Sequence, residues 1–69
     1  MNQLNLHING EARRFVGVST LAELVVALEL TGKRVAVERN GEIVPRSQYP
    51  QAALADGDEL EIVVAVGGG

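Results

Sequence analysis

The sequence predicts an α+β domain of two layers, in which a single helix covers one face of a small sheet. Three observations indicate this fold class. Two Asn-Gly pairs, each between segments with strand character, predict two tight hairpins. A segment with the apolar spacing of a helix lies between them, and an alternating segment near the C-terminus predicts a closing strand.

The first predicted hairpin begins the chain. Apolar and polar residues alternate there with the period of a strand that buries one face. The apolar positions are Leu4, Leu6 and Ile8. Asn-Gly is the preferred pair for a two-residue type I′ turn, so Asn9-Gly10 predicts that residues 11–16 return antiparallel. We expect Phe15 of this second strand to enter the core.

A capping box predicts where the helix starts. The Thr20 hydroxyl and the Glu23 carboxylate can each accept a hydrogen bond from a backbone N–H that the helix leaves unpaired. The apolar stripe that follows consists of Leu21, Leu24, Val25 and Leu28. We expect the helix to end near Glu29, with Gly32 in the left-handed conformation that follows many helix C-termini.

The second predicted hairpin follows the helix. Residues 35–37 form a short apolar strand, Asn40-Gly41 predicts the turn, and residues 42–44 return until Pro45 stops the strand. Residues 46–55 have no clean period and contain Pro50, so we expect irregular chain there with one short helical turn at residues 51–54.

The closing strand is predicted from Glu59 to Val66, after a turn at Asp56-Gly57-Asp58. We expect Leu60, Ile62 and Val64 to face inward and Val63 and Ala65 to face outward. Glycines lack a Cβ and resist regular structure, so residues 67–69 are predicted to form a flexible tail after a single domain of residues 1–66.

Composition excludes several classes of protein. The 69 residues include no cysteine, which excludes disulfides and a thiol nucleophile. The net charge of −3 and an aromatic content of 3% disfavour nucleic acid, whose phosphates and bases require cations and stacking surfaces, and favour a basic protein partner. We find no apolar run long enough to cross a membrane and no secretory signal, so we expect a cytoplasmic location.

The sequence predicts no active site of its own. It has no phosphate-binding loop and no cluster with metal-ligand spacing. We interpret the single histidine, His7, as a solvated strand residue, because a general base needs a pocket and an orienting partner. The acidic set could bind a metal, but we favour a turn followed by a solvated strand face. Its negative charge beside the tail could also steer the tail toward a basic enzyme. Its members are Asp56, Asp58, Glu59 and Glu61.

Four blocks of sequence, considered together, match a known family. They are Asn9-Gly10 after the first strand, residues 20–24 at the helix start, residues 37–48, and residues 56–60 leading to the terminal glycines. With these features the chain resembles the ubiquitin-like β-grasp sulfur carriers, and most closely those of thiamine thiazole biosynthesis. The resemblance implies a mixed sheet of four to five strands covered by one main helix, with the final strand central and parallel to the first.

The resemblance also implies a reaction cycle. An E1-like adenylyltransferase would use ATP and Mg²⁺ to convert the Gly69 carboxylate to an acyl-adenylate, and sulfur obtained from cysteine through a desulfurase would replace AMP. The product is a thiocarboxylate whose sulfur thiazole synthase receives. The chain itself would bind no cofactor, would act as a co-substrate, and would be monomeric when free.

The residues of the tail suit this role. Gly69 offers an unhindered carboxylate, Gly68 has no side chain to obstruct a narrow channel, and Gly67 adds one residue of reach. Before the tail, the residues that could form an apolar docking patch for partner enzymes are Val63, Ala65 and Val66. Alternatively, neighbouring parts of the chain cover the side chains of Val63 and Ala65.

Two other functions remain open at this point. The small subunit of molybdopterin synthase is also a β-grasp carrier with terminal glycines, but it usually approaches its tail through Phe and Pro. Here residues 62–66 are Ile-Val-Val-Ala-Val, which favours the thiamine carrier. A ubiquitin-like interaction or conjugation module, which would form amide links to lysines, is the third interpretation.

Overall fold

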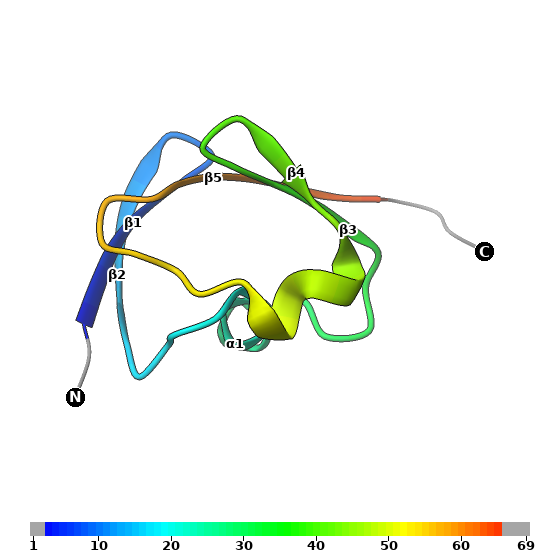
Figure 1. The fold of residues 1–69 in the computed structure, drawn as a ribbon, viewed down its shortest axis with the longest axis horizontal. Coiled ribbons are helices and arrows are strands. Elements are labelled where there is room, and N and C mark those ends of the chain that lie inside the picture. The colour runs from blue at the N-terminus through cyan, green and yellow to red at the C-terminus, as the bar shows by residue number, and fades with distance from the viewer. Residues whose placement is uncertain (1–2, 66–69) are drawn as a thin grey trace.

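The computed structural model describes residues 3–65. In chain order the elements are β1 (Gln3–Ile8), β2 (Glu11–Val16), α1 (Leu21–Ala27), β3 (Val35–Arg39), β4 (Glu42–Val44), the 3₁₀ helix η1 (Arg46–Gln51) and β5 (Glu59–Val64). The five strands form one sheet, and α1 and η1 lie on the same side of it (Figure 1). The predicted α+β class, with one main helix on a sheet, is confirmed.

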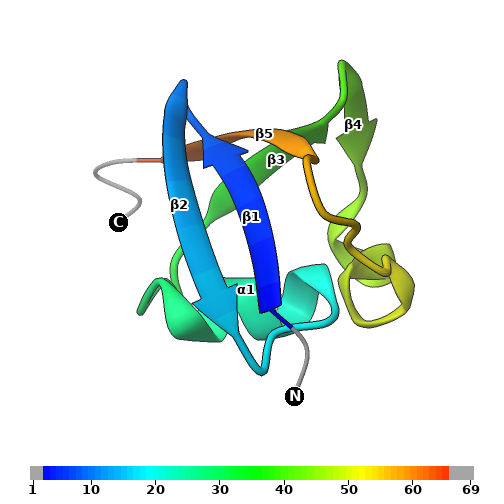
Figure 2. The same cartoon turned by 90° about the vertical axis from the view of Figure 1, so that its left-hand side faces the viewer.

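Strand β5 occupies the centre of the sheet, whose order is β2-β1-β5-β3-β4. It runs parallel to β1 and antiparallel to β3, so the sheet is mixed (Figure 2). The last strand therefore lies between the β1–β2 hairpin and the β3–β4 hairpin. A central final strand that runs parallel to the first is what the resemblance implied.

Both hairpin turns have the predicted conformation. Asn9 and Gly10 have φ angles of 52° and 83°, and Asn40 and Gly41 have 51° and 86°. Positive φ at both central residues is the requirement of a type I′ turn, and Asn and Gly adopt it at little cost. The strands on either side pair in the register that these two-residue loops dictate, with Ile8 opposite Glu11 and Arg39 opposite Glu42.

The helix starts as predicted but ends earlier. Thr20 and Glu23 form the capping box. Helix α1 stops at Ala27, and the first residue after it with a left-handed conformation is Glu29, with φ of 60°. Gly32 also has the positive φ that we expected, 83°, but it lies further along the loop. The N–H groups of Glu29 and Leu30 then bind the C=O groups of Val26 and Val25, which satisfies carbonyls that the helix end leaves free.

The segment after β4 is more ordered than expected. We predicted a helical turn at residues 51–54, whereas the 3₁₀ helix η1 runs from Arg46 to Gln51. Pro45 immediately precedes η1. Pro50 lies inside η1, which tolerates it because a short 3₁₀ helix has few backbone hydrogen bonds for proline to break. Tyr49 of η1 is buried, and its burial raises the pKa of the phenol, against the opposing effect of the Arg46 charge.

The core fills the space between the sheet and the two helices. Its buried apolar residues are Leu4, Leu6, Ile8, Val18, Leu21, Leu24, Val37, Tyr49, Leu60 and Ile62. Val18 and Tyr49 come from segments that carry no periodic signal. Two expectations need correction: Phe15 is only partly buried, and Val64 is 36% exposed because α1 does not extend beneath the end of β5.

Within the part of the chain that the structure describes, no helix has the length and apolar character needed to cross a membrane.

Candidate functional site

The candidate site lies at the C-terminal end of strand β5. Val63 pairs with Ala36 of β3, and the N–H of Ala65 donates to the C=O of Arg34 at 2.9 Å. The backbone ladder with β3 thus continues to the last described residue. The predicted docking residue Val66 and the predicted tail residues Gly67, Gly68 and Gly69 lie outside the described residues, so their assigned roles remain predictions.

The side chains of β5 near this end include an apolar group on the outer face of the sheet, away from α1. Val63 is 63% exposed and Ala65 is also exposed, as the alternation predicted. Ala36, the partner of Val63, shares this face, and so does Ile43 of β4, which is 75% exposed. We call Ala36, Ile43, Val63 and Ala65 the outer apolar patch. None of these side chains is covered by the rest of the described chain.

The sequence analysis did not single out two members of the outer apolar patch, Ala36 and Ile43, of which Ile43 is the larger. Its position opposite Glu38 in the β3–β4 hairpin places it on the outer face. The alternation within residues 42–44 is too short to distinguish the two faces of a strand, so pairing with β3 was needed to orient it.

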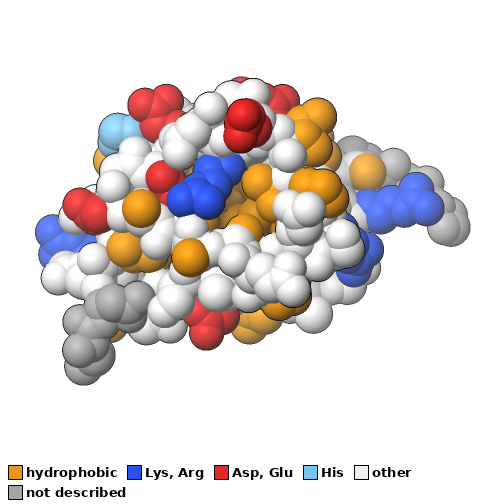
Figure 3. All heavy atoms as spheres, in the orientation of Figure 1, with side chains coloured by type: hydrophobic (Ala, Val, Ile, Leu, Met, Phe, Trp, Pro, Cys, Tyr) orange, Lys and Arg blue, Asp and Glu red, His pale blue; other side chains and the backbone are white. Residues whose placement is uncertain are grey.

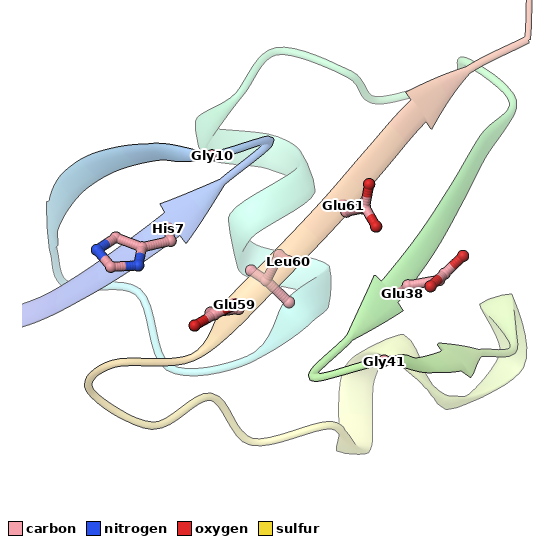
Figure 4. Close-up of a pocket in the computed structure, with 7 residues that line it drawn as sticks. All are labelled: His7, Gly10, Glu38, Gly41, Glu59, Leu60 and Glu61. Carbon is pink, nitrogen blue, oxygen red and sulfur yellow. The ribbon is translucent and has the colours of Figure 1, made fainter.

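A groove of about 290 Å³ adjoins the outer apolar patch on the same face of the sheet. Its lining residues are His7, Gly10, Glu38, Gly41, Glu59, Leu60 and Glu61. Figure 4 shows the imidazole and the three carboxylates on one side of the sheet, on strands β1, β5 and β3. In Figure 3 acidic side chains and the histidine lie along the upper rim of the molecule, with hydrophobic side chains beside them.

The groove is acidic and lacks a countercharge. None of its lining residues is a lysine or an arginine, and Glu38 lies directly opposite Glu61 in the pairing of β3 with β5. Like charges in such a pair repel, so this face favours a cationic partner. Among residues 3–65, no group of three or more His, Cys, Asp or Glu side chains is arranged to hold a metal ion.

Asp58 lies at the predicted turn and is the buried member of the acidic set. Its side chain is buried and accepts hydrogen bonds from Arg39 Nε at 2.9 Å, from the Ala55 N–H at 2.9 Å and from Asn40 Nδ2 at 3.1 Å. Burial alone would raise the pKa of this carboxyl, but the hydrogen bonds and the Arg39 charge outweigh it and lower the pKa. Asp58 is therefore a structural residue.

The remaining acidic residues lie where the turn and the solvated strand face were predicted. Asp56 accepts hydrogen bonds from the backbone N–H and side-chain amide of Asn5, while Glu59 and Glu61 are exposed in the first half of β5. The charged residue level with the end of β5 is Arg34, the backbone partner of Ala65. Negative charge is therefore on the outer face beside the apolar patch and not at the point where the chain leaves the sheet.

Comparison with known proteins places this geometry in a family. Residues 6–69 match the model of the ThiS family. The chain is 38% identical over 65 residues to the sulfur carrier protein ThiS of Bacillus subtilis, covering 93% of this chain and 98% of that protein. It is 33% identical to a crystal structure of the thiamine biosynthesis protein ThiS from Geobacter metallireducens, with a TM-score of 0.79 and coverage of 96% and 100%.

A longer protein contains a similar stretch. The chain is 52% identical over 66 residues to a thiazole synthase of Paramagnetospirillum magneticum, covering 96% of this chain. It spans only 20% of the length of that thiazole synthase. A region with this sequence pattern is thus found both as a small protein and within a larger polypeptide.

Proposed function

This chain belongs to the ThiS family, and from this membership we propose that it is a cytoplasmic sulfur carrier of thiamine biosynthesis that is activated at Gly69. The observation that carries the proposal is the match to the family over residues 6–69, which includes the three terminal glycines. The central position of β5 supports it, because a tail that follows this strand starts from the most firmly held strand of the sheet.

The proposed chemistry takes place at the C-terminal carboxylate. A carboxylate oxygen of Gly69 attacks the α-phosphorus of ATP on an E1-like adenylyltransferase, which binds the nucleotide and Mg²⁺, and pyrophosphate leaves. The outer sulfur of a persulfide formed by a cysteine desulfurase then attacks the acyl carbon, and AMP leaves. A thiol, which acts as the two-electron reductant, cleaves the resulting acyl disulfide, so that a protein or small-molecule disulfide forms and the thiocarboxylate remains. Glycine at this position leaves the acyl carbon open to both attacks.

In this proposal the chain is a co-substrate and its partners supply catalysis. Thiazole synthase is the proposed acceptor of sulfur, and the similar stretch within the Paramagnetospirillum thiazole synthase supports this partner. The outer apolar patch, including Val63 and Ala65, is the proposed docking surface for partner enzymes, because exposed apolar side chains next to the reactive tail would be covered on binding. The acidic groove beside it would favour basic partner surfaces.

The experiment that tests this function is the intact mass of the protein after incubation with its E1-like enzyme, Mg-ATP, cysteine and a desulfurase. A chain that lacks Gly69 is the matched control. We expect a mass gain that equals the replacement of one oxygen by sulfur, only in the full chain. No gain in the presence of an active enzyme, together with amide conjugates to lysines, would instead indicate a conjugation module.

A further inference from the structure

The side chains of both turn asparagines hold β5, one near each end. Asn9 Nδ2 donates to the C=O of Ile62 at 3.1 Å, and Asn9 Oδ1 accepts from the N–H of Ile62 at 2.9 Å. Asn40 Oδ1 accepts from the N–H of Glu59 at 2.9 Å, and Asn40 Nδ2 donates to the Asp58 carboxylate at 3.1 Å. Turn geometry explains why Asn is favoured at these positions, but it does not require these contacts.

Asn9 continues a ladder that the backbone of β1 cannot continue. Strand β1 pairs with β5 only at His7–Glu59 and Ile8–Leu60, and the N–H of Asn9 then donates to the C=O of Leu60 at 2.9 Å. At this point the chain turns away into β2. The Asn9 amide instead binds both the N–H and the C=O of Ile62, which a longer β1 would otherwise have to pair.

Within residues 3–65, the contact with Asn9 is also the last hydrogen-bonded one on that side of β5. Among the hydrogen bonds of residues 3–65, the bonds from Asn9 to Ile62 lie furthest along β5 on its β1 side, whereas on its β3 side the ladder continues to Ala65. Ile62 is 7% exposed and Val64 is 36% exposed, so Ile62 is also the last buried residue of the strand. The end of β5 is therefore held on both sides only as far as Ile62.

We propose that Asn9 is a positioning residue for the activation of Gly69, an inference that rests on the function proposed above. By fixing Ile62 from the β1 side, Asn9 sets the direction in which β5 leaves the sheet when the outer apolar patch is docked. The direction of a strand determines where its extension ends, and a displacement of about 1 Å at a reaction centre can reduce a rate on the order of 100-fold.

The chain contains its own matched control. Asn9→Gly and Asn40→Gly each remove an amide that binds β5, and each leaves a Gly-Gly pair that tolerates the positive φ of a type I′ turn. The two variants differ in which end of β5 loses its contact. Both should be assayed with the E1-like enzyme under conditions where circular dichroism shows that they are folded.

We expect Asn9→Gly to lower kcat for adenylation about tenfold, with KM for the carrier little changed because the docking surface is intact. We expect Asn40→Gly to stay within about twofold of the original chain, since its contacts are at the start of β5. Amide hydrogen exchange of the free proteins provides the structural readout. Asn9→Gly should lose protection at Ile62, and Asn40→Gly at Glu59.

Each outcome decides the inference. Equal kcat losses in the two variants, or full activity of Asn9→Gly despite faster exchange at Ile62, would overturn the positioning role alone. An original chain that is not adenylated would overturn the proposed function and this inference with it. A tenfold selective loss in Asn9→Gly supports both.

Discussion

Asp58 shows how one buried carboxylate organises the turn that leads into the central strand. Its two oxygens bind groups from three separate places, namely Arg39 at the end of β3, Asn40 in the hairpin turn and the backbone of Ala55. Its backbone C=O also accepts from the N–H of His7 at 3.0 Å, which joins the turn to β1. The residue therefore ties both neighbours of β5 to the point where β5 begins.

Protonation of Asp58 should weaken the fold. The pKa of this carboxyl is lowered in the folded state, so the stabilisation it gives is present above its ordinary pKa of about 3.9 and is lost as pH falls through the lower folded value. We expect Asp58→Asn to reduce the free energy of unfolding by about 1–3 kcal/mol at pH 7, because the new side-chain NH₂ group would face the N–H donors that now bind the carboxylate. Urea unfolding at pH 7 and near pH 3 measures the difference.

The difference in stability between the original chain and Asp58→Asn should shrink at the lower pH, because the unfolded chain there binds a proton at Asp58 more readily than the folded carboxyl, whose pKa is lowered. Asp56→Asn is the control, because Asp56 is exposed and its amide oxygen can still accept from Asn5. A difference that is equally large at both pH values would show that the charge of Asp58 is not what stabilises the turn.

Strand β5 combines a buried face with a functional one. Leu60 and Ile62 are buried against α1, while Glu59, Glu61 and Val63 point to the outer face. Because successive side chains of a strand point to opposite faces, β5 contributes one set of residues to the core and a separate set to the outer face. The same alternation explains why the outer apolar patch can be changed without removing a core residue.

Val63→Glu should weaken the binding of partner enzymes without unfolding the domain. Val63 is 63% exposed, so the new carboxylate stays hydrated in the free protein, but it must lose water in an apolar interface and lies on the same face as Glu61. We expect Kd for the E1-like enzyme to rise at least about tenfold, a change of about 1.4 kcal/mol. Calorimetric titration measures Kd, and thermal unfolding checks the fold.

Val16→Glu is the control for this variant. Val16 is also an exposed strand valine, 57% exposed, but it lies on the edge strand β2, away from the end of β5. Partner binding that is unchanged in Val63→Glu, or reduced to the same extent in both variants, would argue against the outer apolar patch as the docking surface.

At the scale of the whole molecule, one face of the sheet is covered by helices and the other is open. Helices α1 and η1 cover one face of the sheet (Figure 1). The other face holds the outer apolar patch and the acidic groove. The central strand ends beside the apolar part of that open face. A partner that covers this face would therefore contact the chain just before the tail begins, so the distance from patch to carboxylate is set by the number of tail residues.

One glycine added after Gly69 should abolish adenylation. The terminal residue is still glycine, so only the reach of the carboxylate changes, by about 3.3–3.6 Å. We expect the extended chain to bind the E1-like enzyme normally but to form no acyl-adenylate, measured by pyrophosphate release. Removal of one glycine is the companion variant, and undiminished adenylation of the extended chain would show that reach is not critical.

Local patterns in the sequence were sufficient to predict most of the fold. The alternation in β1 and β5, the capping box at Thr20 and the two Asn-Gly turns each depend on residues within a few positions of one another. Their period or backbone preference holds whatever the rest of the chain does. The same reasoning placed Val63 and Ala65 on the outer face, where the structure also has them.

The contacts that tie these elements together could be found only in the tertiary structure. Asn9 binds Ile62 across 53 positions of sequence, and Asp58 binds Asn40 across 18, so neither partner is visible in a local window. The early end of α1 likewise depends on Glu29 adopting a conformation for which glycine is the usual signal. The sequence determined which strands, turns and helix form and that the chain ends in glycines. The tertiary structure decided which polar side chains are buried and hold β5, because the insertion of that strand between two hairpins creates their partners.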